Sequence, residues 1–147
     1  MWGHARVSFL RWLLITLVDS SVWLDYSNGQ VTHETDLLDS LLGTEPVAIG
    51  DLILAEVLQG FRNDVDYEAA KGMLASLTIY DLLGASLAIK TADNYRALRK
   101  RGITVRKTVD VVIATFCIER RTPLLYSDRD FDPFVKHSGL TKALPAT

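Results

Sequence analysis

Three aspartates occupy alternate positions in the stretch PLLYSDRDFDPF, directly after a short apolar run. They are Asp128, Asp130 and Asp132, and like charges this close oppose the ionisation of one another. Asp128 follows a predicted buried strand, as Asp19 follows the apolar run 14–18. Ligands of an open parallel α/β sheet bind beyond the carboxyl ends of its strands, so both residues are candidates for a functional site. The alternative is that each aspartate caps the helix that follows it.

Two further acidic residues lie in segments that are otherwise apolar. Glu56 lies in DLILAEVLQGF, a predicted helix in which Asp51 is the expected cap. A glutamate is rarely buried without a partner, although an exposed polar stripe on this helix would also accommodate it. Asp110 follows Thr108, the expected cap of a helix over VDVVIATFCIERR. The helix dipole alone favours an acid in a first turn, so Asp110 is also open to two interpretations.

The two remaining aspartates of the opening stretch are interpreted separately. Asp132 precedes Pro133, and an aspartate cap followed by proline at the first helical position is a standard helix start. We therefore assign Asp132 a structural role. Asp130 is either part of an acidic cluster or a residue that orders the turn.

If the four acids from separate segments converge, a cation is needed to neutralise them. The ligands are hard oxygens without Cys or His, which favours Mg²⁺ or Mn²⁺ over zinc. One or two such ions support phosphodiester cleavage by an activated water. Cys117 lies on the apolar face of its predicted helix and is expected in the core. The predicted catalytic and metal-binding residues are Asp19, Glu56, Asp110 and Asp128, with Asp130 as an additional metal ligand.

Basic residues are concentrated in RALRKRGITVRK, residues 96–107, which holds six of them and no acid. The net charge of the chain is −2, so no global positive field attracts nucleic acid. A basic segment beside an acidic pocket fits a nucleic-acid backbone lying across that pocket. The alternative is a solvated helix end whose charges suit the helix dipole. The candidate RNA-binding residues are Arg99, Lys100, Arg106 and Lys107.

The length of 147 residues suits one compact domain. The single cysteine excludes an intrachain disulfide and indicates a reducing compartment, the cytoplasm. The N-terminal apolar run is interrupted by Arg11 and is too short to span a membrane. A signal peptide is the alternative, but no small-residue cleavage site follows. We expect residues 1–13 to be an extension, 14–136 the folded domain and 137–147 a tail.

Segments typical of strands and helices alternate along the chain, which predicts an α/β domain with a parallel sheet. Glycines or cap-type residues bound most of the helical segments. The predicted strands are 14–18, 46–50, 78–82 and 123–127, and the predicted helices are 20–29, 34–43, 52–62, 65–77, 85–102 and 109–121.

Four blocks of this sequence resemble the acidic blocks of PIN-domain ribonucleases, and most closely those of VapC toxins from bacterial toxin–antitoxin pairs. They occur in the family's order between about Ile15 and Phe134, each with an acid at the expected place. The blocks are LVDSSVWLDY, DLILAEVLQGF, GITVRKTVDVVIATFCIE and LLYSDRDFDPF. The chain departs from the family mainly in its apolar N-terminal extension.

The resemblance implies the PIN-domain fold, with a parallel sheet between helices, and a Mg²⁺- or Mn²⁺-dependent endoribonuclease. It implies that Asp19, Glu56, Asp110 and Asp128 hold the metal and that an activated water attacks the phosphorus. Ser20 lies where the family has a small hydroxyl residue near the metal. VapC toxins cut structured RNA, often tRNA or ribosomal RNA, and so inhibit translation. They form homodimers, and a cognate VapB antitoxin covers the site.

Three other functions compete with the toxin. A nuclease acting outside toxin systems would have the same acidic site. A catalytically inactive PIN-like module would bind RNA or a partner without cutting, but it would not need all four acids. A phosphoacceptor receiver domain would need a lysine at the end of its last strand, and residues 123–130 contain none.

Overall fold

A computed structural model gives the structure of the chain and describes residues 15–144. The predicted N-terminal extension and the first residue of the predicted domain lie outside the described residues. Within residues 15–144, four strands form one sheet in the order β3-β2-β1-β4, and every neighbouring pair is parallel. The strands are β1 (Thr16–Val18), β2 (Val47–Gly50), β3 (Thr78–Tyr80) and β4 (Leu124–Leu125).

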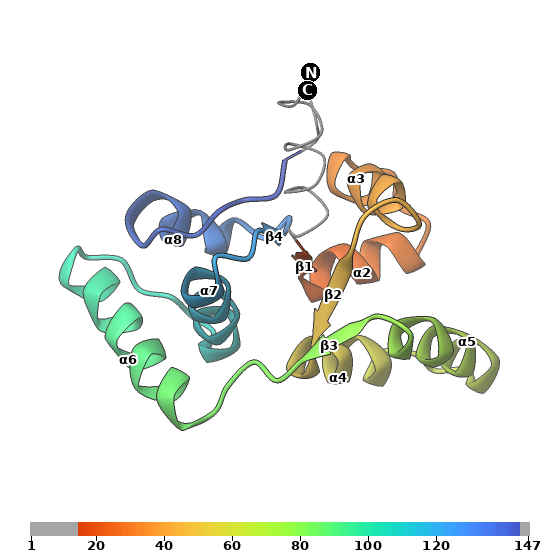
Figure 1. Ribbon diagram of the computed structural model, residues 1–147, viewed down its shortest axis with the longest axis horizontal. Coiled ribbons are helices and arrows are strands. Elements are labelled where there is room, and N and C mark those ends of the chain that lie inside the picture. The colour runs from red at the N-terminus through yellow and green to blue at the C-terminus, as the bar shows by residue number, and fades with distance from the viewer. Residues whose placement is uncertain (1–14, 145–147) are drawn as a thin grey trace, which may run out of the picture.

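Helices connect the strands, and the strands lie between two groups of helices in Figure 1, α2 to α5 on one side and α6 to α8 on the other. This arrangement confirms the predicted α/β domain with a parallel sheet. The helices are α2 (Ser20–Ser27), α3 (His33–Leu41), α4 (Asp51–Gln59), α5 (Asp64–Ala75), α6 (Ala85–Lys100), α7 (Thr108–Arg120) and α8 (Asp132–His137), with a short 3₁₀ helix η1 (Arg129–Phe131).

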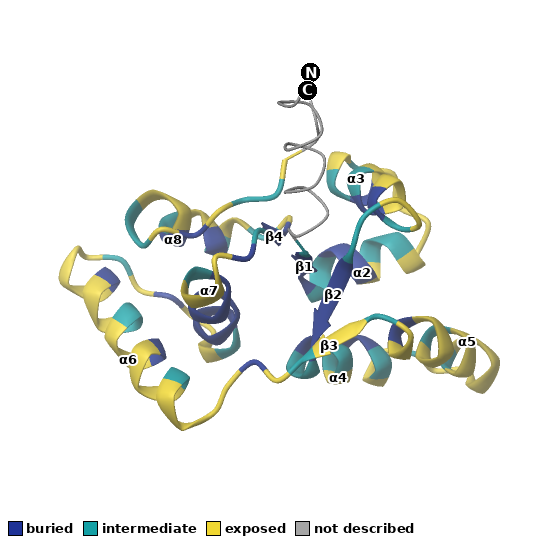
Figure 2. Cartoon of the chain, in the orientation of Figure 1, coloured by how far each residue is buried: buried dark blue, intermediate teal, exposed yellow. Residues whose placement is uncertain are grey.

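The core is one cluster of buried side chains from the strands, from α2, α3 and α4, and from α7, which is the most deeply buried helix in Figure 2. Every residue of α7 from Asp110 to Cys117 is buried, and β1, β2 and β4 are buried throughout. The prediction that Cys117 belongs to the core is confirmed, because only 1% of it is exposed. By contrast, α6 buries only Thr91 and Leu98 and forms an outer layer against α7.

The register of β1 and β4 brings the carboxyl ends of these two neighbouring strands to one edge of the sheet. Val18 of β1 pairs with Leu125 of β4, and the Asp19 N–H donates a 2.9 Å hydrogen bond to the Leu125 carbonyl. The chain turns into α2 directly after Asp19, and η1 begins directly after Asp128. The fold therefore places these two aspartates at the same edge of the sheet.

Three predicted helix caps are wrong in detail. Thr108, Asp51 and Asp132 are each the first residue of their helix, and Lys107, Gly50 and Phe131 precede them as caps without a side-chain cap bond. The Asp51 side chain has other partners, because its Oδ1 accepts hydrogen bonds from the Leu52 and Leu82 N–H groups. Asp132 Oδ1 accepts a 2.6 Å hydrogen bond from the Tyr126 hydroxyl. Its side chain therefore has the predicted structural role, but through this bond and not as a helix cap.

The residues after α8 pack onto the domain. Leu140 is 3% exposed, and an isolated parallel bridge joins Lys142 to Leu124 of β4. Part of the predicted tail therefore adds to the core and the sheet. Among the described residues, no helix is long and apolar enough to cross a lipid bilayer.

Candidate active site

Acidic side chains from four separate elements line one pocket at the carboxyl edge of the sheet. The pocket has a volume of about 460 Å³. Asp19 follows β1, Glu56 lies on α4, Asp110 lies in the first turn of α7, and Asp128 follows β4. All four predicted site residues line it, together with the predicted hydroxyl residue Ser20.

Asp19 is 4% exposed and is held by the start of α2. Its Oδ2 accepts a 2.8 Å hydrogen bond from the Ser21 hydroxyl and a longer one, 3.4 Å, from the Ser21 N–H. The carboxylate therefore caps α2 and also lines the pocket. The helix-cap interpretation of Asp19 is therefore confirmed, and its functional role stays a prediction.

Asp110, Asp128 and Asp130 form a group of three carboxylates. One oxygen from each lies within 4.8 Å of the other two. Asp128 Oδ1 also accepts a 2.9 Å bond from the Asp130 N–H, so Asp128 caps η1. Asp130 Oδ2 lies 3.6 Å from a guanidinium nitrogen of Arg106. The structure thus places Asp130 in the acidic cluster as well as in the turn.

Two buried oxygens of the acidic pocket have no hydrogen-bond partner. They are Glu56 Oε1 and Asp110 Oδ2. Glu56 is half-buried rather than fully buried, and it faces the pocket instead of an exposed stripe. A buried carboxylate oxygen without a donor is costly, so a cation or a hydrogen-bond donor at these two atoms would be favourable.

Burial and mutual repulsion both disfavour the charged forms of these acids. Burial raises the pKa of Asp110 to about 6, and repulsion from Asp19, Asp128 and Asp130 adds to this while Lys107 opposes it. Burial also raises the pKa of Asp19, although hydrogen bonds from Ser21 lower it. The protein alone therefore does not neutralise its own acidic cluster.

Burial acts in the same direction on Glu56. It raises the pKa of this carboxyl, and repulsion from Asp19 adds to the rise, whereas Lys107 and the Ser20 side chain lower it. Lys107 is thus the basic residue that opposes the pKa rise of both Glu56 and Asp110.

The donor set fits a hard divalent cation. Oxygens bound to one Mg²⁺ at about 2.1 Å lie at most about 4.2 Å apart, so the group within 4.8 Å needs only a small closing movement. Its members are carboxylates without Cys or His, which suits Mg²⁺ or Mn²⁺. The unpartnered oxygen of Glu56 is a further candidate ligand at the same pocket.

The four candidate RNA-binding residues lie in different surroundings. Lys107 lines the acidic pocket, and Arg106 pairs with Asp130 at its edge. Arg99 lies over the Tyr95 ring, with 5.6 Å between the guanidinium carbon and the ring centroid. Lys100 lines a separate groove along α6.

Two serines near the site were not predicted. Ser21 bonds Asp19, and the Ser127 hydroxyl donates a 3.1 Å bond to the Ser21 hydroxyl. The local pattern Asp-Ser-Ser could have identified Ser21, since serines bond the carboxylates of nearby cap residues. Nothing local indicates Ser127, because its partner is 106 positions away.

A family model described as PIN domain matches residues 16–135, which include every candidate residue of the acidic site. A curated relative, the VapC ribonuclease Mb1587 of Mycobacterium bovis, is 29% identical over 132 residues, covering 86% of this chain and 96% of the relative.

Two solved structures share the fold at low sequence identity. The VapBC2 complex of Rickettsia felis, bound to a DNA fragment from its promoter, has a TM-score of 0.70 at 18% identity, and the match covers 88% of this chain and 98% of that one. VapC20 of Mycobacterium tuberculosis, a toxin that cleaves the sarcin-ricin loop, has a TM-score of 0.63 at 17% identity, over 89% and 99% of the chains.

Proposed function

The chain belongs to the PIN domain family, and we propose that it is a divalent-metal-dependent endoribonuclease, the toxin of a toxin–antitoxin pair. The observation that carries the proposal is the convergence of Asp19, Glu56, Asp110 and Asp128 on one pocket. Similarity to the VapC ribonuclease of Mycobacterium bovis supports RNA as the substrate.

The acidic side chains would hold the cation, with Asp130 as a further ligand. A bound Mg²⁺ or Mn²⁺ would lower the pKa of a water and stabilise the charge that develops on phosphate oxygens. Ser20 and Ser21 would orient carboxylates from the same turn of α2. This arrangement suits hydrolysis of a phosphodiester, because no side chain in the pocket has the character of an activated nucleophile.

Basic residues at the pocket would attract the RNA backbone. Lys107 lines the pocket and would meet the phosphate next to the scissile bond, while Arg106, Arg99 and Lys100 would contact phosphates further along the strand. Such contacts position the RNA without reading its sequence. We propose a structured RNA, tRNA or ribosomal RNA, as the target, so that cleavage inhibits translation.

The partners follow from the same relatives. We propose a cognate VapB-type antitoxin that covers the acidic pocket, a homodimer, and a cytoplasmic location. Complexes of toxin with antitoxin are among the structural neighbours of this chain. An antitoxin side chain of positive charge would satisfy the same unpartnered oxygens of Glu56 and Asp110 that a metal would.

The test is cleavage of total bacterial RNA by the purified protein, with Mg²⁺ or Mn²⁺ compared with EDTA. Asp110→Asn keeps the shape of the side chain and removes its charge, so discrete cuts should disappear. Asp81→Asn, an exposed aspartate outside the pocket, is the matched control and should cut like the wild type. Expression in bacteria should arrest growth for the wild type and Asp81→Asn but not for Asp110→Asn.

The outcomes separate the competing functions. Metal-dependent cuts without growth arrest would indicate a nuclease outside toxin systems. Tight RNA binding with no cutting, after any bound antitoxin is removed, would indicate an inactive binding module. Equal cutting by Asp110→Asn and the wild type would show a contaminating nuclease and remove support for this site.

A further inference from the structure

A second hollow lies between α6 and α7, directly beside the acidic pocket. It has a volume of about 310 Å³, near the lower end of the range for small-ligand sites. We name it the α6–α7 hollow. It is lined by Ala88, Thr91, Ala92, Tyr95 and Arg96 of α6 and by Thr108 and Val111 of α7.

The first turn of α7 separates the α6–α7 hollow from the acidic pocket. Thr108 lines both, whereas Val111 lines only the hollow and Asp110 only the pocket. Successive residues of a helix are about 100° apart, so Asp110 projects to a different side from Thr108 and Val111. A helix is roughly 10 Å across. An RNA strand with one phosphate at Asp110 can therefore place a neighbouring nucleotide at the hollow.

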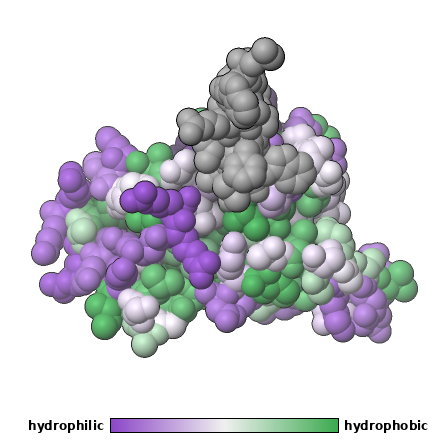
Figure 3. Space-filling view, in the orientation of Figure 1, coloured by the Kyte–Doolittle hydropathy of each residue, from purple (hydrophilic) through white to green (hydrophobic). Residues whose placement is uncertain are grey.

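The lining of the hollow combines apolar groups with hydroxyls and positive charge. The methyl groups of Ala88 and Ala92 and the ring of Tyr95 supply apolar contact, and Thr91 and Thr108 supply hydroxyls. Arg96 is exposed and lines both this hollow and the adjoining groove with Lys100 and Arg101. Hydrophilic side chains dominate the surface at the left of Figure 3, over the outer part of α6.

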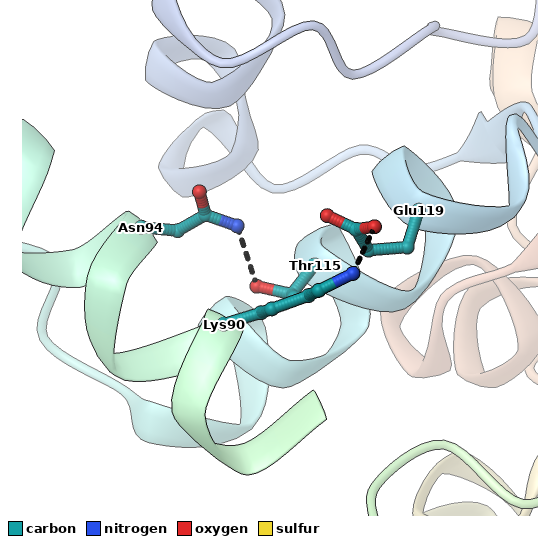
Figure 4. Close-up of polar contacts among 4 residues, drawn as sticks. All are labelled: Lys90, Asn94, Thr115 and Glu119. Carbon is teal, nitrogen blue, oxygen red and sulfur yellow. Dashed lines mark hydrogen bonds and ion pairs between the residues drawn. The ribbon is translucent and has the colours of Figure 1, made fainter. Parts of the chain in front are cut away.

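Two polar contacts join α6 to α7, the two helices that line the hollow (Figure 4). Asn94 Nδ2 donates a 3.0 Å hydrogen bond to the hydroxyl of Thr115, which is fully buried. Lys90 Nζ lies 2.7 Å from Glu119 Oε2. Both pairs join α6 to α7, so the hollow is a preformed feature of this part of the chain.

We propose that the α6–α7 hollow is a nucleobase subsite, which receives the base of a nucleotide flanking the scissile phosphate. Tyr95 would stack on or beside the base, and Arg96 would meet the phosphate of the same nucleotide. Base stacking on aromatic side chains beside basic residues is the usual mode of binding unpaired RNA. The subsite rests on the proposed ribonuclease function, because it places the strand relative to Asp110. It adds a contact to a base where the predicted basic residues contact only phosphates.

The variants that test the subsite are Ala92→Leu and Ala69→Leu. Both residues are exposed helical alanines, but Ala92 of α6 lines the α6–α7 hollow, whereas Ala69 lies on α5, outside the hollow and outside the groove of basic residues. Leucine is a good helix former, so both variants should fold, which circular dichroism verifies. Ala92→Leu fills the hollow. Arg96→Gln, a second variant, removes the charge without filling it.

The probe is the shortest RNA that the wild type cuts, with abasic sites introduced one at a time on either side of the cut. We expect Ala92→Leu to raise KM about 5-fold or more with little change in kcat, and Ala69→Leu to leave both unchanged. An abasic site at one position of the RNA should weaken its binding to the wild type by a similar factor. The same abasic site should weaken RNA binding to Ala92→Leu no further. Binding is measured by fluorescence anisotropy with Asp110→Asn in each background, so that no cutting occurs.

Each result decides separately on the subsite and on the function. If the protein cuts RNA but Ala92→Leu matches Ala69→Leu and no abasic position is coupled to Ala92→Leu, the subsite is wrong and the ribonuclease stands. If Ala92→Leu instead loses binding of the antitoxin while RNA binding is intact, the hollow belongs to a protein partner. If the wild type neither cuts nor binds RNA, the proposed function and the subsite are both wrong.

Discussion

The hydroxyl of Ser21 donates a 2.8 Å hydrogen bond to Oδ2 of Asp19, its neighbour two positions earlier. The same hydroxyl accepts a 3.1 Å bond from Ser127, which lies beyond the end of β4. The carboxylate at the end of β1 is thus tied to the loop that carries Asp128. Two strand ends of the acidic pocket are held together by a chain of serine hydroxyls.

Ser21→Ala should weaken metal binding more than it weakens folding. Without the hydroxyl, Asp19 loses a bond that lowers its pKa and orients its carboxylate. Loss of a residue that orients a metal ligand typically costs about 10- to 100-fold in metal affinity or activity. The measurement is the Mn²⁺ concentration that gives half-maximal cleavage. Ser27→Ala, an exposed serine on the same helix, is the control and should leave this concentration unchanged.

Ser127→Ala should have a smaller effect in the same direction, because it removes a bond to Ser21 and none to the carboxylate itself. An unchanged Mn²⁺ requirement in Ser21→Ala would mean that the backbone N–H of Ser21 is enough to orient Asp19.

The sequence predicts well those site residues whose position depends on local pattern. Asp19 and Asp128 directly follow apolar strand segments, so the architecture alone places them at the carboxyl edge of the sheet. The local pattern left Glu56 and Asp110 open to two interpretations each, and the structure places both at the pocket, with Asp110 buried and Glu56 half-buried. Their roles as metal ligands stay a prediction that the cleavage and metal experiments test.

The remaining features depend on distances that no local pattern encodes. The Ser21–Ser127 bond and the α6–α7 hollow both arise from helices and loops far apart in the chain. Caps are equally hard to predict: Thr108 has the right side chain, but Lys107 holds the cap position because the backbone turns one residue earlier. A shift of one residue at a helix end is common and alters which side chain caps it.

Two glycine-to-alanine substitutions should change stability in opposite directions. A Cβ at Gly50 would lie 2.3 Å from the Leu82 side chain, in a fully buried contact. Gly50→Ala should therefore destabilise the fold by about 1–3 kcal/mol. Gly72 lies within exposed α5 with open space around it, so Gly72→Ala should stabilise by about 0.5–1 kcal/mol. Urea unfolding measures both, and equal signs would contradict the packing at Gly50.

The two contacts between α6 and α7 should differ in strength and in salt dependence. Asn94→Ala leaves the buried Thr115 hydroxyl without its partner and should cost about 1–3 kcal/mol at any salt concentration. Lys90→Gln removes an exposed ion pair with Glu119 and should lower the free energy of unfolding by no more than about 1 kcal/mol. This loss should disappear in high salt, because salt screens exposed charges. Urea unfolding at low and high salt distinguishes them. A large, salt-resistant loss in Lys90→Gln would contradict the exposed character of that pair.

Asp110→Asn should stabilise the metal-free protein at neutral pH although it removes activity. Burial raises the pKa of Asp110 from 3.8 to about 6, so the folded state binds this proton more tightly than the unfolded state. The favourable contribution is therefore complete below about pH 4 and is lost as the pH rises to about 6. Asparagine resembles the protonated acid and has no charge to bury.

The expected gain of Asp110→Asn at pH 7 is about 1–3 kcal/mol, a rise of several degrees in Tm for a chain of this size. Thermal unfolding in EDTA should show this gain at neutral pH and none near pH 4, with exposed Asp81→Asn as the control. Adding Mn²⁺ should then raise the Tm of the wild type more than that of Asp110→Asn, because binding to the folded state alone stabilises it. If instead Asp110→Asn were less stable than the wild type in EDTA at neutral pH, the carboxylate would have a partner in the folded protein. The acidic pocket would then need no cation.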